Sequence, residues 1–141
     1  MALMCDIRIM DETANVAESY ISMGLIAGDG GAWYLPRLVG IDRALELLWS
    51  ARPVGAEEAL RIGMVTEVAP EGQSLARAIE MAGTFVRQPP EAVRMYKRAV
   101  YQAQTMALDA HLDMMSSHMA VLRNTPEHRE RVAGFLAQKK P

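Results

Sequence analysis

The fold is decided by the stretch Gly24-Leu25-Ile26-Ala27-Gly28-Asp29-Gly30-Gly31-Ala32-Trp33-Tyr34-Leu35-Pro36-Arg37-Leu38-Val39-Gly40. Its glycines at 24, 28, 30 and 31 interrupt regular structure, because glycine favours turns and tolerates positive φ. The apolar residues that follow predict a helix that runs through Val39 and stops at Gly40. The sequence therefore predicts a glycine-rich turn that opens into a helix with free N–H groups at its start.

Short strands and helices are predicted on both sides of this turn. Upstream, β-favouring residues predict one strand around residues 7–9 and another over residues 16–21. Downstream, a second helix begins at Asp42 and is broken by Pro53, and a two-turn helix covers residues 55–63. Met64 to Val68 then predict a strand.

The organisation of the chain changes near Gly72. After it, apolar residues recur with the 3.6-residue period of a helix, and Pro89-Pro90 and Thr125-Pro126 mark places where helices begin. We therefore predict two regions: residues 1–72 contain short strands and helices, and residues 73–141 form four amphipathic helices. The fold class is α/β.

Composition narrows the class of protein. Half of the 141 residues are hydrophobic, 23% are charged and the net charge is −2, which is ordinary for a globular protein and gives no sign of binding nucleic acid or an anionic membrane. Cys5 is the single cysteine, which excludes an internal disulfide and fits a reducing cytosol. No apolar run approaches the roughly 18 residues of a membrane span. We therefore expect a cytoplasmic protein.

Four blocks of the sequence, in this order, resemble the enoyl-CoA hydratase/isomerase (crotonase) family: residues 4–9, 24–40, 56–65 and 134–141. The first contains a Cys-Asp-Ile-Arg-Ile strand and the second the family's G-x-G-G turn with its following helix. The resemblance covers nearly the whole chain. It implies a part of the crotonase spiral of ββα turns, followed by a mainly helical C-terminal region that builds a trimer.

The resemblance also implies a reaction. Family members hydrate or isomerise the double bond of acyl-CoA thioesters, with no cofactor beyond the coenzyme A of the substrate and no metal. This chain resembles the C-terminal half only, and the family's oxyanion-hole N–H donors and the first catalytic carboxylate are expected before Met1. We therefore expect weak or no activity from the chain alone. The alternative is a non-catalytic module for interaction or oligomerisation.

The second acid/base position of hydratases falls on Tyr20. Hydratases have F-G-x-P-E where this chain has Val16-Ala17-Glu18-Ser19-Tyr20. In an extended segment residues two apart face the same side, so Glu18 can reach toward the same pocket as Tyr20. A phenol is a poor general base at neutral pH but an adequate proton donor. The alternative is that Glu18 is a surface acid and Tyr20 a packing residue.

The glycine-rich turn carries further candidates by resemblance. The amide at the Gly28 position helps hold the attacking water in hydratases, and related isomerases and dehalogenases have an aspartate one position before Asp29. Asp29 is thus an acid/base or nucleophile, or else it caps the helix. Trp33 either packs or lines an acyl pocket. Phe135 matches a family position that reaches into a neighbouring subunit's CoA pocket.

One helical stripe predicts association. It consists of Leu108, Leu112, Met115, Met119 and Leu122. Its 4-3-4-3 spacing is typical of a helix docked on another. We expect a homo-oligomer, a trimer as in the family, or association with a complementary N-terminal half. The alternative is packing on the chain's own helices. His111 and His118 have no evident third ligand, which argues against a metal site.

Overall fold

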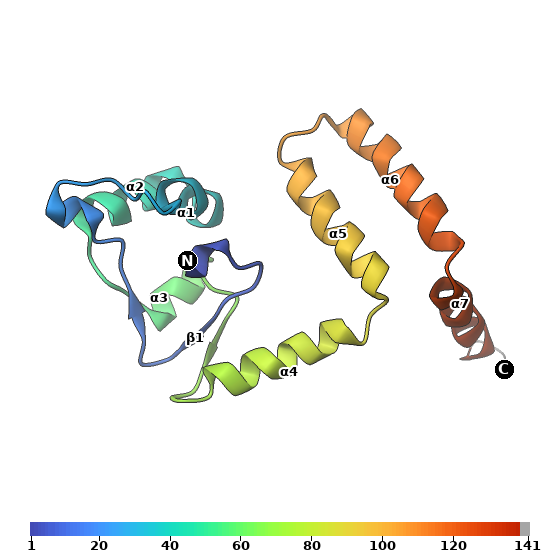
Figure 1. Cartoon of the computed structure of the whole chain (residues 1–141). Coiled ribbons are helices and arrows are strands. Elements are labelled where there is room, and N and C mark those ends of the chain that lie inside the picture. Colours follow the sequence, from blue (N-terminus) through green and yellow to red (C-terminus); the bar gives the residue numbers. More distant parts are fainter. Residues whose placement is uncertain (139–141) are drawn as a thin grey trace. The chain divides into compact units, whose positions relative to one another are not determined.

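The computed structural model describes residues 1–138, and Lys139, Lys140 and Pro141 at the end of the predicted helical region lie outside them. The described chain divides into two compact units (Figure 1). The first spans Met1–Met81 and the second begins at Ala82.

The first unit contains short elements around two small sheets. In chain order they are the 3-10 helix η1 (Ala2–Met4), β1 (Ile9–Asp11), β2 (Asn15–Val16), the 3-10 helix η2 (Tyr20–Met23), α1 (Gly31–Val39), α2 (Ile41–Ser50), β3 (Val54–Gly55), α3 (Ala56–Arg61) and β4 (Glu67–Ala69). Strand β1 pairs in parallel with β4, Met10 opposite Val68, and β2 pairs antiparallel with β3, Val16 opposite Val54. The helix α4 (Ser74–Val86) follows.

Helices α1 and α2 pack against each other (Figure 1) and cover the core. Leu35 of α1 and Val54 of β3 are the largest fully buried side chains. Burial of such an aliphatic side chain stabilises the fold by roughly 1.5–3 kcal/mol. The rest of the cluster consists of Met10, Ala44, Leu47, Ala56, Ala59, Met64 and Val65. This core joins both sheets to α1, α2 and α3.

The predicted turn and the end of the predicted helix at Val39 are confirmed, but the helix begins earlier than expected and includes Gly31. Gly30 has φ +94°, a conformation that glycine adopts at no steric cost, and α1 begins at the next residue and ends at Val39. The predicted strand over residues 64–68 forms later than expected, as β4. The glycines thus mark the turn, whereas the last of them is already part of the helix.

The predicted strand over residues 16–21 is wrong beyond Val16. The chain leaves the strand there and forms η2, which ends at Met23; the N–H of the next residue, Gly24, donates a hydrogen bond of 2.9 Å to the carbonyl of Ile21. A β-favouring segment forms a strand only where a partner is available for pairing and packing. Strand β3 offers two residues, so pairing stops and the local turn prevails.

The second unit is helical, and α4 with this unit forms the mainly helical C-terminal region that the sequence predicted. It contains α5 (Pro90–Ala103), α6 (Leu108–Arg123) and α7 (Pro126–Gln138). Helices α5 and α6 pack side by side as a hairpin (Figure 1), and His111 Nε2 lies 3.1 Å from the carbonyl oxygen of Ala99. None of the helices within residues 1–138 is long and apolar enough to cross a membrane.

Candidate active site

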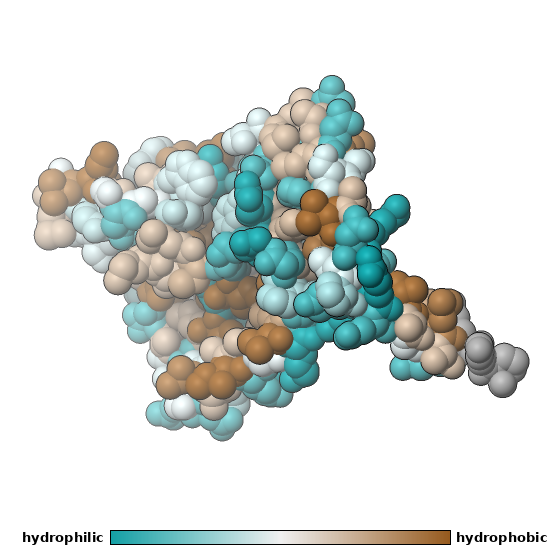
Figure 2. Space-filling view, turned by 45° about the vertical axis from the view of Figure 1, so that its right-hand side comes forward, coloured by the Kyte–Doolittle hydropathy of each residue, from teal (hydrophilic) through white to brown (hydrophobic). Residues whose placement is uncertain are grey.

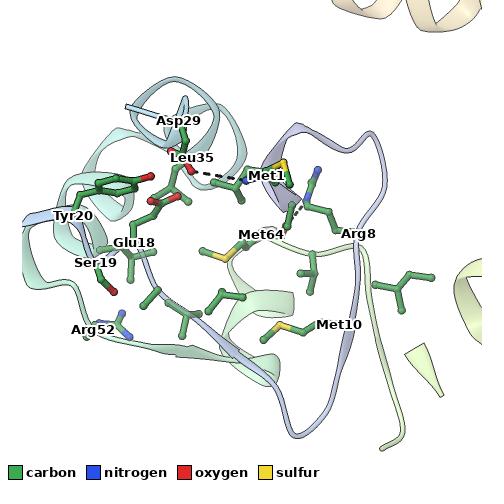
Figure 3. Close-up of a pocket in the computed structure, with 18 of the residues that line it drawn as sticks. Met1, Arg8, Met10, Glu18, Ser19, Tyr20, Asp29, Leu35, Arg52 and Met64 are labelled. Carbon is green, nitrogen blue, oxygen red and sulfur yellow. Dashed lines mark hydrogen bonds and ion pairs between the residues drawn. The ribbon is translucent and has the colours of Figure 1, made fainter. Parts of the chain in front are cut away.

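The first unit contains an open cavity of about 430 Å³ that is lined by residues of η1, β1, β2, β3, α1 and α2 and of the loops between them (Figure 3). Apolar side chains form most of its wall, and among them are the core residues Met10, Leu35, Leu47, Val54 and Met64. The polar side chains on it are Arg8, Glu18, Ser19, Tyr20, Asp29 and Arg52. An apolar cavity with a few polar groups on one wall is typical of a small-molecule site.

Glu18 lies against the start of α1. A Cβ atom placed on Gly31 would lie 2.7 Å from Glu18 Oε1 and 3.0 Å from the Cβ of Ala27. Any larger residue than glycine would therefore displace the Glu18 carboxyl group. Gly31 is itself buried, so the close approach of Glu18 to Gly31 occurs in the packed interior of the unit.

Asp29 lines the same cavity from the glycine-rich turn. Its Oδ1 accepts a hydrogen bond of 3.1 Å from the Gly31 N–H, and its Oδ2 lies 3.9 Å from the Met1 amino group. The bond to Gly31 satisfies an N–H at the beginning of α1, as a capping residue does. Asp29 thus stabilises the start of the helix while its carboxyl group faces the cavity.

The surroundings of Glu18 change its affinity for a proton. Burial raises the pKa of its carboxyl group, the negative charge of Asp29 raises that pKa further, and the Met1 amino group lowers it. The net effect is upward, so Glu18 keeps its proton to a higher pH than an ordinary glutamate. A carboxyl group of this kind is suited to general acid/base chemistry.

Tyr20 and Glu18 both line the cavity, although the segment that carries them is not a strand. In Figure 3 they lie with Asp29 on one side of the cavity, opposite Arg8. The structure therefore brings the three catalytic candidates to one site. Which of them transfers a proton stays a prediction.

The other three candidates lie outside this cavity. Gly28 is exposed in the turn, and Trp33 is 47% exposed, with the Arg37 guanidinium 3.7 Å above its ring. Phe135 lies on α7 of the second unit and is 57% exposed. Their roles in water, acyl or CoA binding stay predictions.

Sequence reasoning missed two arginines on the cavity wall. Arg52 pairs with Glu46 and Glu58, and Arg8 Nε donates a hydrogen bond of 2.6 Å to the carbonyl of Met64. The only sequence signal for Arg52 is a glutamate six residues away on each side, which no regular element brings together. For metals, residues 1–138 contain no group of three or more His, Cys, Asp or Glu side chains arranged to hold an ion.

Comparison with known proteins identifies the family. The sequence model of enoyl-CoA hydratase/isomerase matches residues 1–141. The chain is 31% identical over 140 residues to the short-chain-enoyl-CoA hydratase of Clostridium acetobutylicum, covering 99% of this chain and 54% of that protein. It is also 31% identical over 141 residues to the 1,2-epoxyphenylacetyl-CoA isomerase of Escherichia coli, covering 100% of this chain and 54% of that protein.

Solved structures agree with the sequence match. The chain superimposes on the enoyl-CoA hydratase of Bacillus anthracis with a TM-score of 0.90 at 32% identity, covering 99% of this chain and 54% of that one. With DspI of Pseudomonas aeruginosa the TM-score is 0.91 at 34% identity, covering 99% and 53%. The chain thus spans about half the length of the relatives it matches, and the expected partial crotonase fold is confirmed. Matched along its whole length in sequence and nearly so in fold, the chain belongs to the enoyl-CoA hydratase/isomerase family.

Proposed function

We propose that this chain supplies part of an acyl-CoA site at which the double bond of a thioester substrate is hydrated or shifted. The observation that carries the proposal is the apolar cavity of about 430 Å³ with Glu18, Tyr20 and Asp29 on its wall. Relatives named as CoA-ester hydratases and a CoA-ester isomerase support the substrate class. An apolar wall fits an acyl chain, and the polar side fits the proton transfers.

Both reactions need a group that holds and releases a proton beside an apolar chain. Hydration adds a proton to one carbon and hydroxide to its neighbour, and isomerisation removes a proton from one carbon and returns it to another. Neither changes the oxidation state of the substrate overall, so neither needs a redox cofactor. Glu18 is the leading proton carrier, because its pKa is raised and it lies on the cavity wall. Tyr20 and Asp29 are the alternatives.

Turnover by this chain alone is proposed to be weak or absent. By resemblance, the oxyanion-hole donors belong to the part of the relatives that this chain does not span. Two donors worth ~3 kcal/mol each correspond to about a ten-thousandfold difference in rate. Loss of the enoyl absorbance of a short 2-enoyl-CoA measures turnover, with the Clostridium acetobutylicum hydratase assayed in parallel. A rate within about a hundredfold of that enzyme contradicts this proposal.

Binding tests the site independently of turnover. Butyryl-CoA has no double bond to hydrate, so it reports binding alone. Added to the isotope-labelled chain, it is expected to shift the amide signals of Glu18, Tyr20 and Gly31, which line or border the cavity. The amide of Leu75, exposed on α4, serves as the control. Signals of the cavity residues that do not move at millimolar butyryl-CoA contradict an acyl-CoA site.

A second candidate function is a non-catalytic module that associates with other chains. The observation that favours it is the second unit, where Ala99 is the only buried residue within 82–138. Hydrophobic side chains reach the visible surface in several separate places (Figure 2). The proposed partners are copies of this chain, as a trimer or larger assembly, or a complementary N-terminal half. An assembly of defined mass whose amide signals do not shift with butyryl-CoA would favour this function.

We also propose that the protein works in the cytoplasm. Cys5 is a free and exposed thiol. Thiols of this kind persist in reducing compartments and are oxidised outside them.

A further inference from the structure

Two carboxyl groups converge on one residue at the start of α1. Asp29 accepts the Gly31 N–H at 3.1 Å, and Glu18 Oε1 lies where a Gly31 side chain would begin, 2.7 Å from an added Cβ. Gly31 is buried, and both carboxyl groups line the same cavity (Figure 3). Both acids therefore lie against the same glycine at the start of α1.

The two acids are held in different ways. Asp29 is oriented by the backbone hydrogen bond to Gly31, which uses one of its oxygens. Glu18 accepts no hydrogen bond from residues 1–138 and is positioned by packing against Gly31, close to Ala27. Its oxygens are therefore available to a bound substrate, whereas one oxygen of Asp29 is already occupied.

We propose that Asp29 is a positioning residue for Glu18, and that Gly31 joins the two as a carboxyl pair of which Glu18 is the member that meets the substrate. The substrate contact of Glu18 rests on the proposed function. The pairing of Asp29 and Glu18 at Gly31 does not depend on it. Partial burial without a hydrogen-bond donor favours the acid form of Glu18, and the negative charge of Asp29 raises the pKa of Glu18 further. Glu18 is therefore the member of the pair that holds a proton above the ordinary pKa of a glutamate.

The charges around the pair do not remove this asymmetry. The Met1 amino group lies 3.9 Å from Asp29 and offsets part of its charge. Arg8 donates to the carbonyls of Met64 and Cys5, and Arg52 is bound by two glutamates, so both guanidinium groups on the wall have other partners. Burial and the charge of Asp29 still outweigh the amino group at Glu18.

Carbon-detected NMR of the side-chain carboxyl of Glu18 tests the pair in the 141-residue chain. Asp29→Asn keeps an oxygen that can accept the Gly31 N–H but removes the negative charge. The midpoint of the Glu18 titration is expected to move to lower pH. Asp42→Asn, the same change on α2, is expected to leave it in place. Acetylation of the Met1 amino group is expected to move it to higher pH, since a positive charge is lost.

Gly31→Ala tests the geometry of the pair. The added methyl group displaces Glu18, so the effect of Asp29→Asn on the Glu18 midpoint is expected to be smaller in this background, as a double-mutant cycle shows. Should Gly31→Ala prevent folding, Asp29→Asn decides alone. Equal midpoints of the Glu18 titration in the wild-type chain and in Asp29→Asn would contradict the proposed carboxyl pair.

The pair and the proposed function can fail separately. The titration needs no turnover, so a shifted midpoint together with no response to butyryl-CoA leaves the pair standing and rejects the acyl-CoA site. Where turnover is measurable, the Glu18-dependent limb of the pH–rate profile is expected to move to lower pH in Asp29→Asn. If Asp29 has only a structural role, Asp29→Asn lowers the fraction of folded protein but leaves the Glu18-dependent limb of the pH–rate profile at the same pH.

Discussion

Arg52 donates two hydrogen bonds of 2.8 Å to Glu58, one to each carboxylate oxygen. The same guanidinium group donates to both oxygens of Glu46, at 2.6 and 3.0 Å. Glu46 belongs to α2 and Glu58 to α3, so one side chain ties these two helices across β3. Because Arg52 lines the cavity, this arrangement also fixes part of the wall of the candidate site.

Arg52→Lys is expected to lower the thermal unfolding midpoint. An ammonium group cannot reproduce the planar fork that binds two carboxylates at once. Arg43→Lys is the matched control, because Arg43 has a single 4.0 Å contact with Glu46. Circular dichroism during heating measures both. A drop for Arg43→Lys as large as that for Arg52→Lys would show that the bidentate geometry is irrelevant.

Stability is expected to fall in acid. Arg52 holds the pKa of Glu46 and of Glu58 below the ordinary value of 4.5, and Arg77 does the same for Glu67. These carboxyl groups bind protons less tightly in the folded state, so their contribution is complete above about pH 4.5 and is lost as pH falls through the folded pKa values. Glu18, with its raised pKa, acts in the opposite sense and favours the folded state in acid.

Urea unfolding between pH 7 and pH 3 checks this dependence. The free energy of unfolding is expected to decline below about pH 4.5, and to decline less in Arg52→Gln and in Arg77→Gln. Identical slopes in the wild-type chain and both variants would mean that the ion pairs do not set the acid limit.

Leu35→Ala is expected to lower the free energy of unfolding by about 2–5 kcal/mol. Leu35 is 1% exposed and its loss leaves a hole between α1 and the cavity. Leu75→Ala, the same change at a residue that is 71% exposed on α4, is expected to change it by less than about 0.5 kcal/mol. Urea denaturation compares the two, and equal losses would contradict the described core.

Glu18→Gln is expected to reduce kcat by about a hundredfold or more in any form of the protein with measurable turnover, because general acid/base catalysis contributes that much. Tyr20→Phe is expected to change kcat little. Glu57→Gln, at an exposed position on α3, is the control. The reverse result would assign the proton transfer to the phenol of Tyr20. If neither variant matters, Asp29 is the next residue to test.

The turn and the helices were predictable because their signals are local. Glycines before Ala32 and the helical period after Gly72 act within a few residues, and the structure follows them. The strand expected over residues 16–21 depended on a partner strand elsewhere in the chain. That partner, β3, pairs with only two residues, which the sequence of the segment itself cannot reveal.

The candidate site was predictable only in part. Glu18 and Tyr20 do line one cavity, but Glu18 lies in the irregular segment before η2 and Tyr20 is the first residue of η2, so strand alternation does not bring them there. The contact between Glu18 and Gly31 depends on how closely the two segments approach, as does the position of Arg52 between two helices. Such contacts are set by tertiary packing, and no local period or motif encodes them.

The last prediction is that the chain associates. The stripe expected on α6 is divided in the structure: Met115 and Leu122 are half-buried, whereas Leu108, Leu112 and Met119 are 73%, 55% and 46% exposed. Met115 and Leu122 pack within the chain. Leu108, Leu112 and Met119 remain largely exposed to solvent. Exposed apolar side chains that share a helix face favour contact with another chain.

Light scattering at micromolar concentration is expected to give a multiple of the chain mass of 15.6 kDa. Leu112→Glu places a charge on the exposed side of α6 and is expected to return the mass to that of one chain. Ser117→Glu adds the same charge at another exposed position of the helix and is expected to leave the assembly intact. A mass of 15.6 kDa for the wild-type chain refutes association. If both variants dissociate the assembly, an added charge anywhere on α6 disrupts it, and the exposed face is not the specific contact.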